Sequence, residues 1–324
     1  MSTDSFTESP APLPGVDNVP DHDRSRDRPA AAAGVVFLAM FILGGLDNAV
    51  AVIARDTGLW QFHFIRACLA VTIMVALAQM GVINITPKRT WAVALRGGLT
   101  GLAMLVYFGS LAFLTLSQAA AGLFTAPIWV MLLSAVFLRQ RVGPMRILAA
   151  AIGFAGVLLV LRPFDGGVNT LALFPMVAGF FYACGAIATR QWCTGESAMS
   201  MLLFFFLSLG VFGLCGATIM SLWPHEVPAG PDGFILRGFG PMGQLSIGLT
   251  VLQAVGSMLA VGFVFRGYQL GDAAQVAIYE YALLVFAAGW SYLLFDQSVT
   301  LMSAIGMGFI ILSGIVISLR SRRA

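Results

Sequence analysis

Ten apolar stretches run along this chain, and the second five repeat the first five. Each is about 20 residues long, the length at which an α-helix crosses roughly 30 Å of hydrocarbon. Segments 116–120 and 156–162 resemble 270–274 and 314–320, in the same order and at nearly equal spacing. Because five helices start and end on opposite sides of a membrane, a second copy must insert upside down. We therefore expect an all-α integral membrane protein with ten transmembrane helices in two inverted five-helix repeats.

The composition agrees with a chain that has the bilayer as its solvent. It is 59% hydrophobic and 10% charged, whereas soluble domains carry about 25% charged residues. The stretches do not alternate at period two, so helices are favoured over the strands of a barrel. The predicted helices span residues 34–54, 61–81, 93–115, 119–138, 144–161, 170–189, 200–222, 244–264, 273–294 and 301–319.

The positions of the cations predict the orientation. With the amino terminus inside, Arg55, Arg162 and Arg237 fall outside and Arg66 falls within a helix. All other Lys and Arg residues fall inside: Arg24, Arg26, Arg28, Lys88, Arg89, Arg96, Arg139, Arg141, Arg146, Arg190, Arg266, Arg320, Arg322 and Arg323. Because cytoplasmic loops are enriched in such cations, we expect a multi-pass protein of the inner membrane with both termini in the cytoplasm.

We divide the chain into three parts. Residues 1–32 form a cytoplasmic tail, disordered because they are rich in proline and charge. Residues 33–163 are the first repeat, and residues 164–321 are the second. Segment 223–243 is rich in Gly and Pro, so we expect it outside and without regular structure, either as a mobile spacer or as a lid.

Three ionisable residues lie well inside predicted helices, namely Asp47, Arg66 and Glu280. Each costs roughly 2.5–3.5 kcal/mol at a helix centre, so such residues usually face the interior of a bundle. Asp47 and Arg66 lie at similar depths, about 8–10 Å below the outer boundary. Either they form a structural ion pair, or they contact a solute directly together with Asn48; Arg66 also has the alternative of extending outward.

Glu280, between Tyr279 and Tyr281, has no basic residue at its depth on a predicted helix. One hypothesis is that it carries a coupling proton or binds a cationic group of the solute. The alternative is a neutral acid that is hydrogen-bonded to a backbone carbonyl.

Further candidates for solute contacts are Tyr107, Trp129, Tyr182 and Gln253, near mid-depth, and Tyr281 beside Glu280. Aromatic rings with a few polar groups suit an amphipathic organic solute, provided that they converge; each taken alone is more often a packing residue. The scattered Cys and His residues predict neither a metal site nor a cofactor.

Several segments resemble the EamA family of the drug/metabolite transporter superfamily. They are 126–127 with 132–142, then 153–157 with 161–163, and in the second half 281–285 with 293–297. Arg66 in 64–66 looks like the family's arginine on the second helix. Where the family usually has Glu after the fourth and ninth helices, this chain has Gln140 and Gln297, so a mechanism that uses those carboxylates is in doubt here.

The resemblance implies a central cavity lined by the third, fourth, eighth and ninth helices, with the fifth and tenth at the periphery. It also implies transport of metabolites, often export. We expect a secondary transporter of a small organic metabolite, an amino acid or a related solute, that works by alternating access and is coupled to protons. Its partners are the solute and the lipid bilayer, and no nucleic acid. The alternatives are a membrane enzyme that acts on lipid and a scaffold without transport activity.

Overall fold

The fold is built from helices alone in the part of the chain that the structure describes. The structure is a computed structural model that describes residues 29–137, 143–162, 170–223, 225–270, 276 and 279–321. The α-helices are α1 (Pro29–Ile53), α2 (Leu59–Gln79), α3 (Thr90–Ser110), α4 (Leu116–Leu123), α5 (Ala126–Phe137), α6 (Pro144–Leu161), α7 (Pro175–Trp192), α8 (Ala198–Leu222), α9 (Gln244–Leu270), α11 (Ala282–Phe295) and α12 (Leu301–Ser321), with short 3₁₀ turns η2 (Thr170–Leu173) and η3 (Gly230–Gly233).

Most of these helices agree with the predicted segments to within a few residues. By length and composition, α1, α2, α3, α4 with α5, α8 and most of α9 are long and apolar enough to cross a membrane, while α6, α11 and α12 contain shorter apolar stretches. Four boundaries within the described residues differ by five or six residues. The first helix begins at Pro29, inside the range assigned to the tail, and α9 continues to Leu270, whereas α3 already ends at Ser110 and α7 begins only at Pro175. The first turns of the ninth predicted helix lie largely outside the described residues.

The fourth predicted helix, 119–138, is divided into α4 and α5. The break lies at Phe124 and Thr125, directly before Pro127, which has no N–H to donate. The Thr125 hydroxyl donates to the Gly122 carbonyl at 2.7 Å, so this carbonyl at the end of α4 is satisfied within the break. A proline in the middle of an apolar run therefore ends one helix and starts another.

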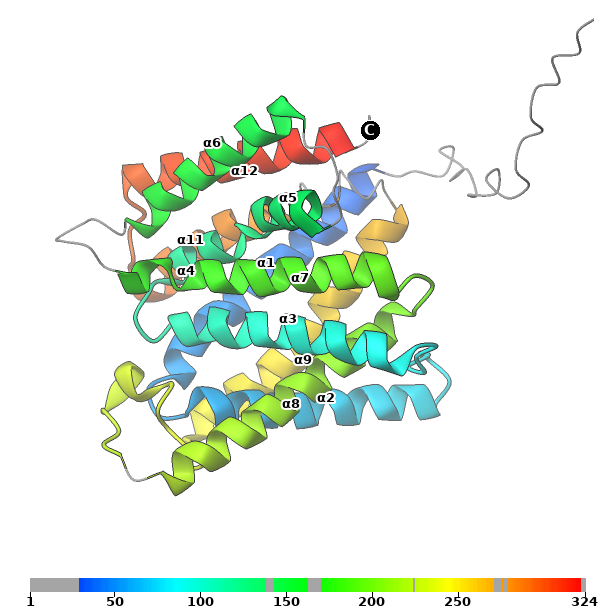
Figure 1. The fold of residues 1–324 in the computed structure, drawn as a ribbon. Helices are drawn as coiled ribbons and strands as arrows, with labels where there is room; N and C mark the ends of the chain where they lie inside the picture. The colour runs from blue at the N-terminus through cyan, green and yellow to red at the C-terminus, as the bar shows by residue number, and fades with distance from the viewer. Residues whose placement is uncertain are drawn as a thin grey trace, which may run out of the picture.

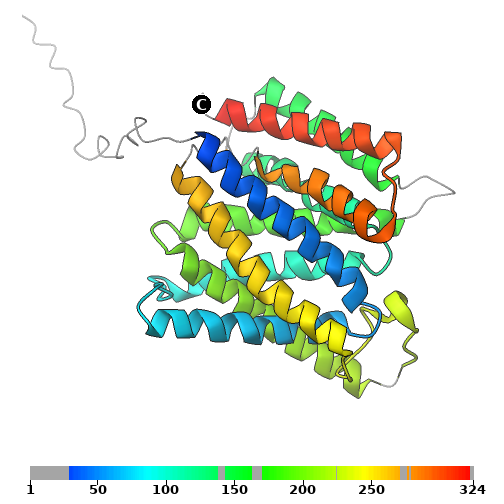
Figure 2. The same cartoon turned by 180° about the vertical axis from the view of Figure 1, so that it is seen from behind.

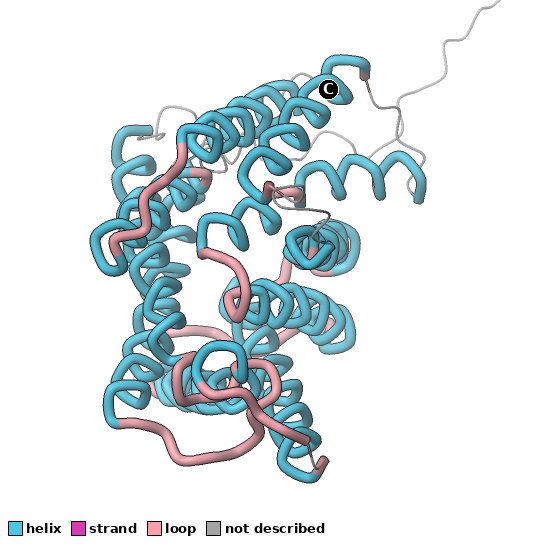
Figure 3. Tube along the Cα trace, turned by 90° about the vertical axis from the view of Figure 1, so that its left-hand side faces the viewer, coloured by secondary structure: helices cyan, strands magenta, loops and turns pink. Residues whose placement is uncertain are grey.

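The helices run back and forth between two ends of the molecule (Figures 1 and 2). In Figure 1, α1 begins and α12 ends toward the same end of the stack. The connections 54–58, 111–115 and 223–243 lie at the opposite end, which Figure 3 faces. The pair α6 and α12 forms one outer layer, and α2 with α8 lies at the other extreme.

The main contacts join the first half of the chain to the second. Helix α1 packs on α9 and α11, and α7 packs on α3 and on α4 and α5. Helix α2 packs on α8, and α6 packs on α12. The first-half helices α1, α2, α3, α4–α5 and α6 correspond in order to the second-half helices α7, α8, α9, α11 and α12. When each helix is replaced by its counterpart, every packed pair named above becomes a pair that is also packed. Each half therefore depends on the other for its partners.

Glycines allow several of these helices to approach closely. A Cβ atom at Gly156 would lie 2.6 Å from the Gly306 carbonyl oxygen, and one at Gly306 would lie 2.6 Å from that of Gly156. Gly44 of α1 faces the backbone of α11, where a Cβ would meet the Ala287 nitrogen at 3.0 Å. Small residues permit such contacts between membrane helices, whose association depends on close packing. A Cβ atom at Gly308, by contrast, would have no neighbouring atom within 4 Å.

Apart from the 3₁₀ turn η3, the described residues of segment 223–243 lack regular structure, as predicted, and the segment is held to the ends of α1 and α2. It contains the 3₁₀ turn η3, and Phe234 within it is fully buried. Trp60 donates its indole N–H to the Ile235 carbonyl at 2.7 Å, and Gln61 exchanges two hydrogen bonds with the Gly240 backbone. The segment therefore covers the end of the bundle above α2.

Asp56, in the connection between α1 and α2, joins this segment to the start of α9. Its carboxylate accepts hydrogen bonds from the Ser246 hydroxyl at 2.6 Å, the Thr57 hydroxyl at 2.7 Å and the Gly243 N–H at 3.1 Å. Partial burial would raise the pKa of Asp56, but these hydrogen bonds and the positive charge of Arg237 lower it overall. The anchor therefore remains ionised at neutral pH.

Replacing Gly306 with Ala should destabilise the fold, whereas replacing Gly308 with Ala should not. The first substitution places a methyl group against the backbone of α6, and such overpacking costs about 1–3 kcal/mol. Thermal unfolding of the two purified variants in detergent measures the difference. Equal melting temperatures would show that α6 and α12 are not in close contact.

Candidate functional site

The Asp47 carboxylate is held inside the bundle by two neutral side chains from other helices. Tyr107 of α3 donates its hydroxyl to Asp47 Oδ2 at 2.9 Å, and Gln253 of α9 donates its amide N–H to Asp47 Oδ1 at 3.1 Å. All three residues are buried, and Gln253 is fully so. This group therefore joins α1, α3 and α9 at one point.

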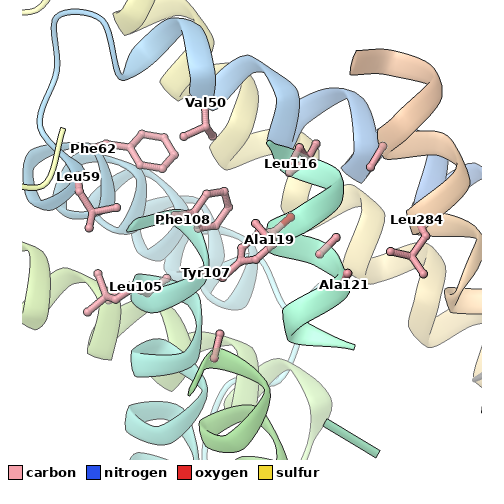
Figure 4. Close-up of a cluster of buried hydrophobic side chains, with 14 of the residues drawn as sticks. Val50, Leu59, Phe62, Leu105, Tyr107, Phe108, Leu116, Ala119, Ala121 and Leu284 are labelled. Atoms are coloured by element: carbon pink, nitrogen blue, oxygen red, sulfur yellow. The ribbon is translucent and has the colours of Figure 1, made fainter. Parts of the chain in front are cut away.

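Arg66 lies near this carboxylate, but its guanidinium is surrounded by aromatic rings. Its Cζ atom lies 5.5 Å from the ring centroids of Phe108 and Phe206 and 5.9 Å from that of Phe62. Cation–π attraction of this kind stabilises a charge that is removed from water. The rings of Phe62 and Phe108 pack edge to face, and Figure 4 shows both in the apolar cluster below α1. Of the alternatives that the sequence left open, a direct ion pair with Asp47 is not formed in the structure, although the two charges interact electrostatically.

Several buried polar atoms in this region have no hydrogen-bond partner in the protein. They are Nε and Nη1 of Arg66, both ring nitrogens of His63, and Oε1 of Gln253. His63 is fully buried one helical turn before Arg66 and packs against Phe108. A buried donor or acceptor without a partner costs about 1–3 kcal/mol. This set of unsatisfied atoms on α2 and α9 is typical of a place that binds a polar group from outside the chain.

Asn48 connects α1 to α11, and its side-chain amide is fully hydrogen-bonded within the protein. Its amide donates to the Gly44 carbonyl at 2.9 Å and to the Ala287 carbonyl at 3.1 Å. Its side-chain oxygen accepts from the Ser291 hydroxyl at 2.7 Å. Asn48 therefore fixes α11 against α1, next to Asp47 in the chain. Gly44, one turn earlier on the same unbroken helix, is a close-packing position.

The other candidate residues lie on other elements, with Trp129 on α5, Tyr182 on α7 and Tyr281 at the start of α11. Trp129 packs against Phe180, and its buried indole N–H has no hydrogen-bond partner. Tyr182 is 41% exposed, whereas Tyr281 is buried. The charge of Glu280, which is half-buried, acts on both of these tyrosines.

The structure thus brings together Asp47, Asn48, Tyr107 and Gln253, with Arg66 beside them, and places the remaining candidates elsewhere. His63, Ser291 and the aromatic cage were not predicted, because a lone His, a Ser and three Phe residues in apolar helices look like packing residues. Their only sequence signal was the spacing of His63 and Arg66, which puts them on one face of a helix. Across the described residues, no group of three or more His, Cys, Asp or Glu side chains is placed to hold a metal ion.

Replacing Tyr107 with Phe should lower the stability of the protein by roughly 1.5–3 kcal/mol, because a hydrogen bond to a buried carboxylate is lost. Tyr292→Phe is the matched control, since Tyr292 is 55% exposed. Thermal melts of both variants measure the effect. A Tyr107→Phe melt equal to that of the control would contradict the role given to this hydroxyl.

Known proteins match this chain along most of its length. The model of the EamA-like transporter family matches residues 31–162 and 169–319. A crystal structure of another protein aligns with 91% of this chain and 98% of its own, with a TM-score of 0.56 at 16% identity, so the two share a fold.

Three relatives carry functional names. A riboflavin transporter of Rhizobium johnstonii is 23% identical over 80% of each chain. The pseudopaline exporter CntI of Pseudomonas aeruginosa is 24% identical over 80% of this chain and 85% of the relative. An S-adenosylmethionine uptake transporter of Rickettsia felis is 25% identical over 65% of each chain. All three are named as transporters, not as enzymes, and their solutes differ. With both halves matched by the family model, this chain belongs to the EamA-like transporter family and is a membrane transporter.

Proposed function

We propose that the chain is a secondary transporter that moves an amino acid or a related small solute across the bacterial inner membrane by alternating access. The observation that carries the proposal is the buried polar cluster of Asp47, Arg66, His63 and Gln253, which lies in helices of both halves. Charged and unsatisfied groups in membrane helices are expensive, so their usual place is along the path of a solute or a proton.

The pattern of helix contacts supports an inverted repeat. Helix α1 packs on α9 and α11, and its counterpart α7 packs in the same way on α3 and α5. The pairs α2 with α8 and α6 with α12 each join a helix to its own counterpart in the other half. We infer ten membrane helices in two repeats, 33–163 and 164–321, with both termini in the cytoplasm. Rocking of one repeat against the other would then expose the cluster to each side in turn.

The charges of the cluster support a zwitterionic solute. Arg66 has donor atoms without acceptors, and Asp47 lies nearby with only neutral donors bound to it. A carboxylate of the solute would bind Arg66 and His63, and an ammonium group would approach Asp47. Asn48 would keep α11 in place. Trp129, Tyr182 and Tyr281, which lie apart from this cluster in the structure, would contact the solute at another stage of its passage.

Reconstituted protein should exchange at least one zwitterionic amino acid in a counterflow assay across proteoliposomes. Arg66→Gln should weaken the apparent affinity about tenfold or more, because a charge-assisted hydrogen bond is worth roughly 1.5–3 kcal/mol. Arg55→Gln, which changes an exposed arginine between α1 and α2, is the matched control and should behave as the wild type. Exchange of neutral aromatic solutes alone, unchanged in Arg66→Gln, would contradict the zwitterion assignment.

Glu280 is our candidate for proton coupling, because it is a half-buried acid in an apolar part of the chain and its charge acts on Tyr182 and Tyr281. Replacing Glu280 with Gln should make uptake independent of an imposed pH gradient while exchange between equal solute pools continues. Fluxes with and without the gradient, in vesicles that carry wild type or variant, measure this. An unchanged response to the gradient would remove Glu280 from the coupling step.

A further inference from the structure

At the end of the bundle where α1 begins, the connection 80–89 between α2 and α3 is bound by the connection 193–197 between α7 and α8 (Figure 1). The Glu196 carboxylate accepts hydrogen bonds from the Lys88 N–H at 2.8 Å and from the Arg89 N–H at 2.6 Å. Arg89 is the N-cap residue of α3, and its own side chain makes no capping hydrogen bond. An acid from the second half of the chain therefore caps the start of a helix of the first half.

The same arrangement occurs at the other end of the bundle, with the two halves exchanged. Asp56, in the connection between α1 and α2, accepts from the Gly243 N–H directly before α9 and from the Ser246 hydroxyl in the first turn of α9. Helices α1 and α2 correspond to α7 and α8, and α3 corresponds to α9. Asp56 therefore binds the start of α9 as Glu196 binds the start of α3.

A second hydrogen bond at each end follows the same exchange. The hydroxyl of Ser197, the N-cap residue of α8, donates to the Asn84 carbonyl at 2.9 Å. The N–H of Leu59, the first residue of α2, donates to the Phe234 carbonyl at 2.7 Å. Because α2 and α8 are counterparts, two separate contacts at each end of the bundle agree with one inverted repeat.

Both bound connections place apolar side chains in the interior of the bundle. Ile83 and Ile85 of the connection 80–89 pack against the large apolar cluster, and so does Ile235 of segment 223–243. Phe234 is a fully buried member of the same cluster, which also contains the three phenylalanine rings of the cage. Each connection therefore covers its own end of the bundle, and each is bound there by an acid of the other half.

We propose that Asp56 and Glu196 are counterpart latches, which hold segment 223–243 and the connection 80–89 over the two ends of the transport path and release them in turn. The inference rests on the proposed alternating access and adds to it the groups that close each end. Each latch joins the two halves of the chain, so rocking of one half against the other separates its partners. The hydrogen bonds from Lys88, Arg89 and Gly243 are exposed, so water can replace them when a latch opens.

Cysteine labelling tests the latches without knowledge of the solute. The native residues Cys68, Cys184, Cys193 and Cys215 are first replaced with Ala. One reporter is Thr250→Cys, one turn after Ser246, and the other is Ser200→Cys, one turn after Ser197; both native residues are fully buried. Each reporter is exposed, in sealed vesicles of known orientation, to sulfonatoethyl methanethiosulfonate, which does not cross the bilayer.

Each latch substitution should open one end only. Asp56→Asn should accelerate labelling of Thr250→Cys several-fold from the side opposite the termini, and leave Ser200→Cys no faster. Glu196→Gln should do the reverse, from the side of the termini. Loss of a hydrogen bond to the carboxylate raises the population of the state in which that end is open.

The controls separate a latch from a merely structural contact. Asp232→Asn, which changes an exposed acid of η3 in the same segment, should leave both reporters as they are. Ser313→Cys, 4% exposed where α12 meets α6, should remain unreactive in both latch variants. Acceleration of both reporters by each latch variant, or of neither reporter by either, would overturn the proposal.

A cross-link provides a second measurement, which does not depend on the reporters. A Cβ atom at Gly243 would lie 3.7 Å from Asp56 Cγ, so Asp56→Cys and Gly243→Cys are close enough for a disulfide. Oxidation of this double variant should stop exchange in proteoliposomes, and reduction should restore it, while each single variant keeps its rate under the oxidant. Normal exchange by the cross-linked protein would overturn the outer latch.

The two measurements also separate this inference from the proposed function, because labelling does not require transport. Selective acceleration of the two reporters in a protein that exchanges no amino acid would contradict the proposed solute and support the latches. Normal exchange of amino acids by a protein whose reporters respond to neither substitution would contradict the latches alone.

Discussion

The carboxylate of Asp47 can remain inside a bundle of apolar helices because Tyr107 and Gln253 donate hydrogen bonds to it. A charge at this depth is costly unless it is compensated, and the donors come from α3 and α9. Helices from both halves of the chain must therefore meet at Asp47 before it is satisfied. The nearby arginine is stabilised differently, by the faces of three phenylalanine rings, so the two opposite charges lie close together without neutralising each other directly.

This separation of charges agrees with a site that waits for a ligand. A direct salt bridge would have used the donors of Arg66, and a solute would have to break it on binding. In the cage, the guanidinium is held in position by rings that offer no hydrogen-bond acceptor, so two of its donor atoms remain available. Preorganisation of this kind lowers the cost of binding, because the side chain is already ordered. Asn48 has the complementary role, since its own hydrogen bonds are complete and it fixes the geometry around Asp47.

Much of the fold follows from the sequence, because long apolar runs bounded by turns leave few alternatives in a membrane. Helix α6 begins and ends where it was predicted, and α8 nearly does. The division at Thr125 was not predicted, although Pro127 stands in the sequence two residues after it. The contacts that hold segment 223–243 to Trp60 and Gln61 were not predicted, since these residues are distant from it in the sequence. In the candidate site, Asp47 and Arg66 were correctly predicted to be buried, because each is a charged residue within an apolar helix.

The side chains that converge on them depend on how each helix is rotated about its axis, which the sequence does not show. The position of His63 near Arg66 and the hydrogen bond between Ser291 and Asn48 both depend on that rotation.

The pairing of helices between the two halves has a consequence for the synthesis of the protein. Helix α1 leaves the ribosome first, yet its principal neighbours, α9 and α11, are among the last segments made. Until they arrive, Asp47 lacks the hydrogen bond from Gln253, and Gly44 and Asn48 lack their contacts with α11. The newly made first half is therefore an intermediate that must be protected from premature association or degradation. The first three helices therefore gain their main partners in the reverse order of their synthesis. Helix α3 can pack on α7 first, α2 then packs on α8, and α1 packs on α9 and α11 last.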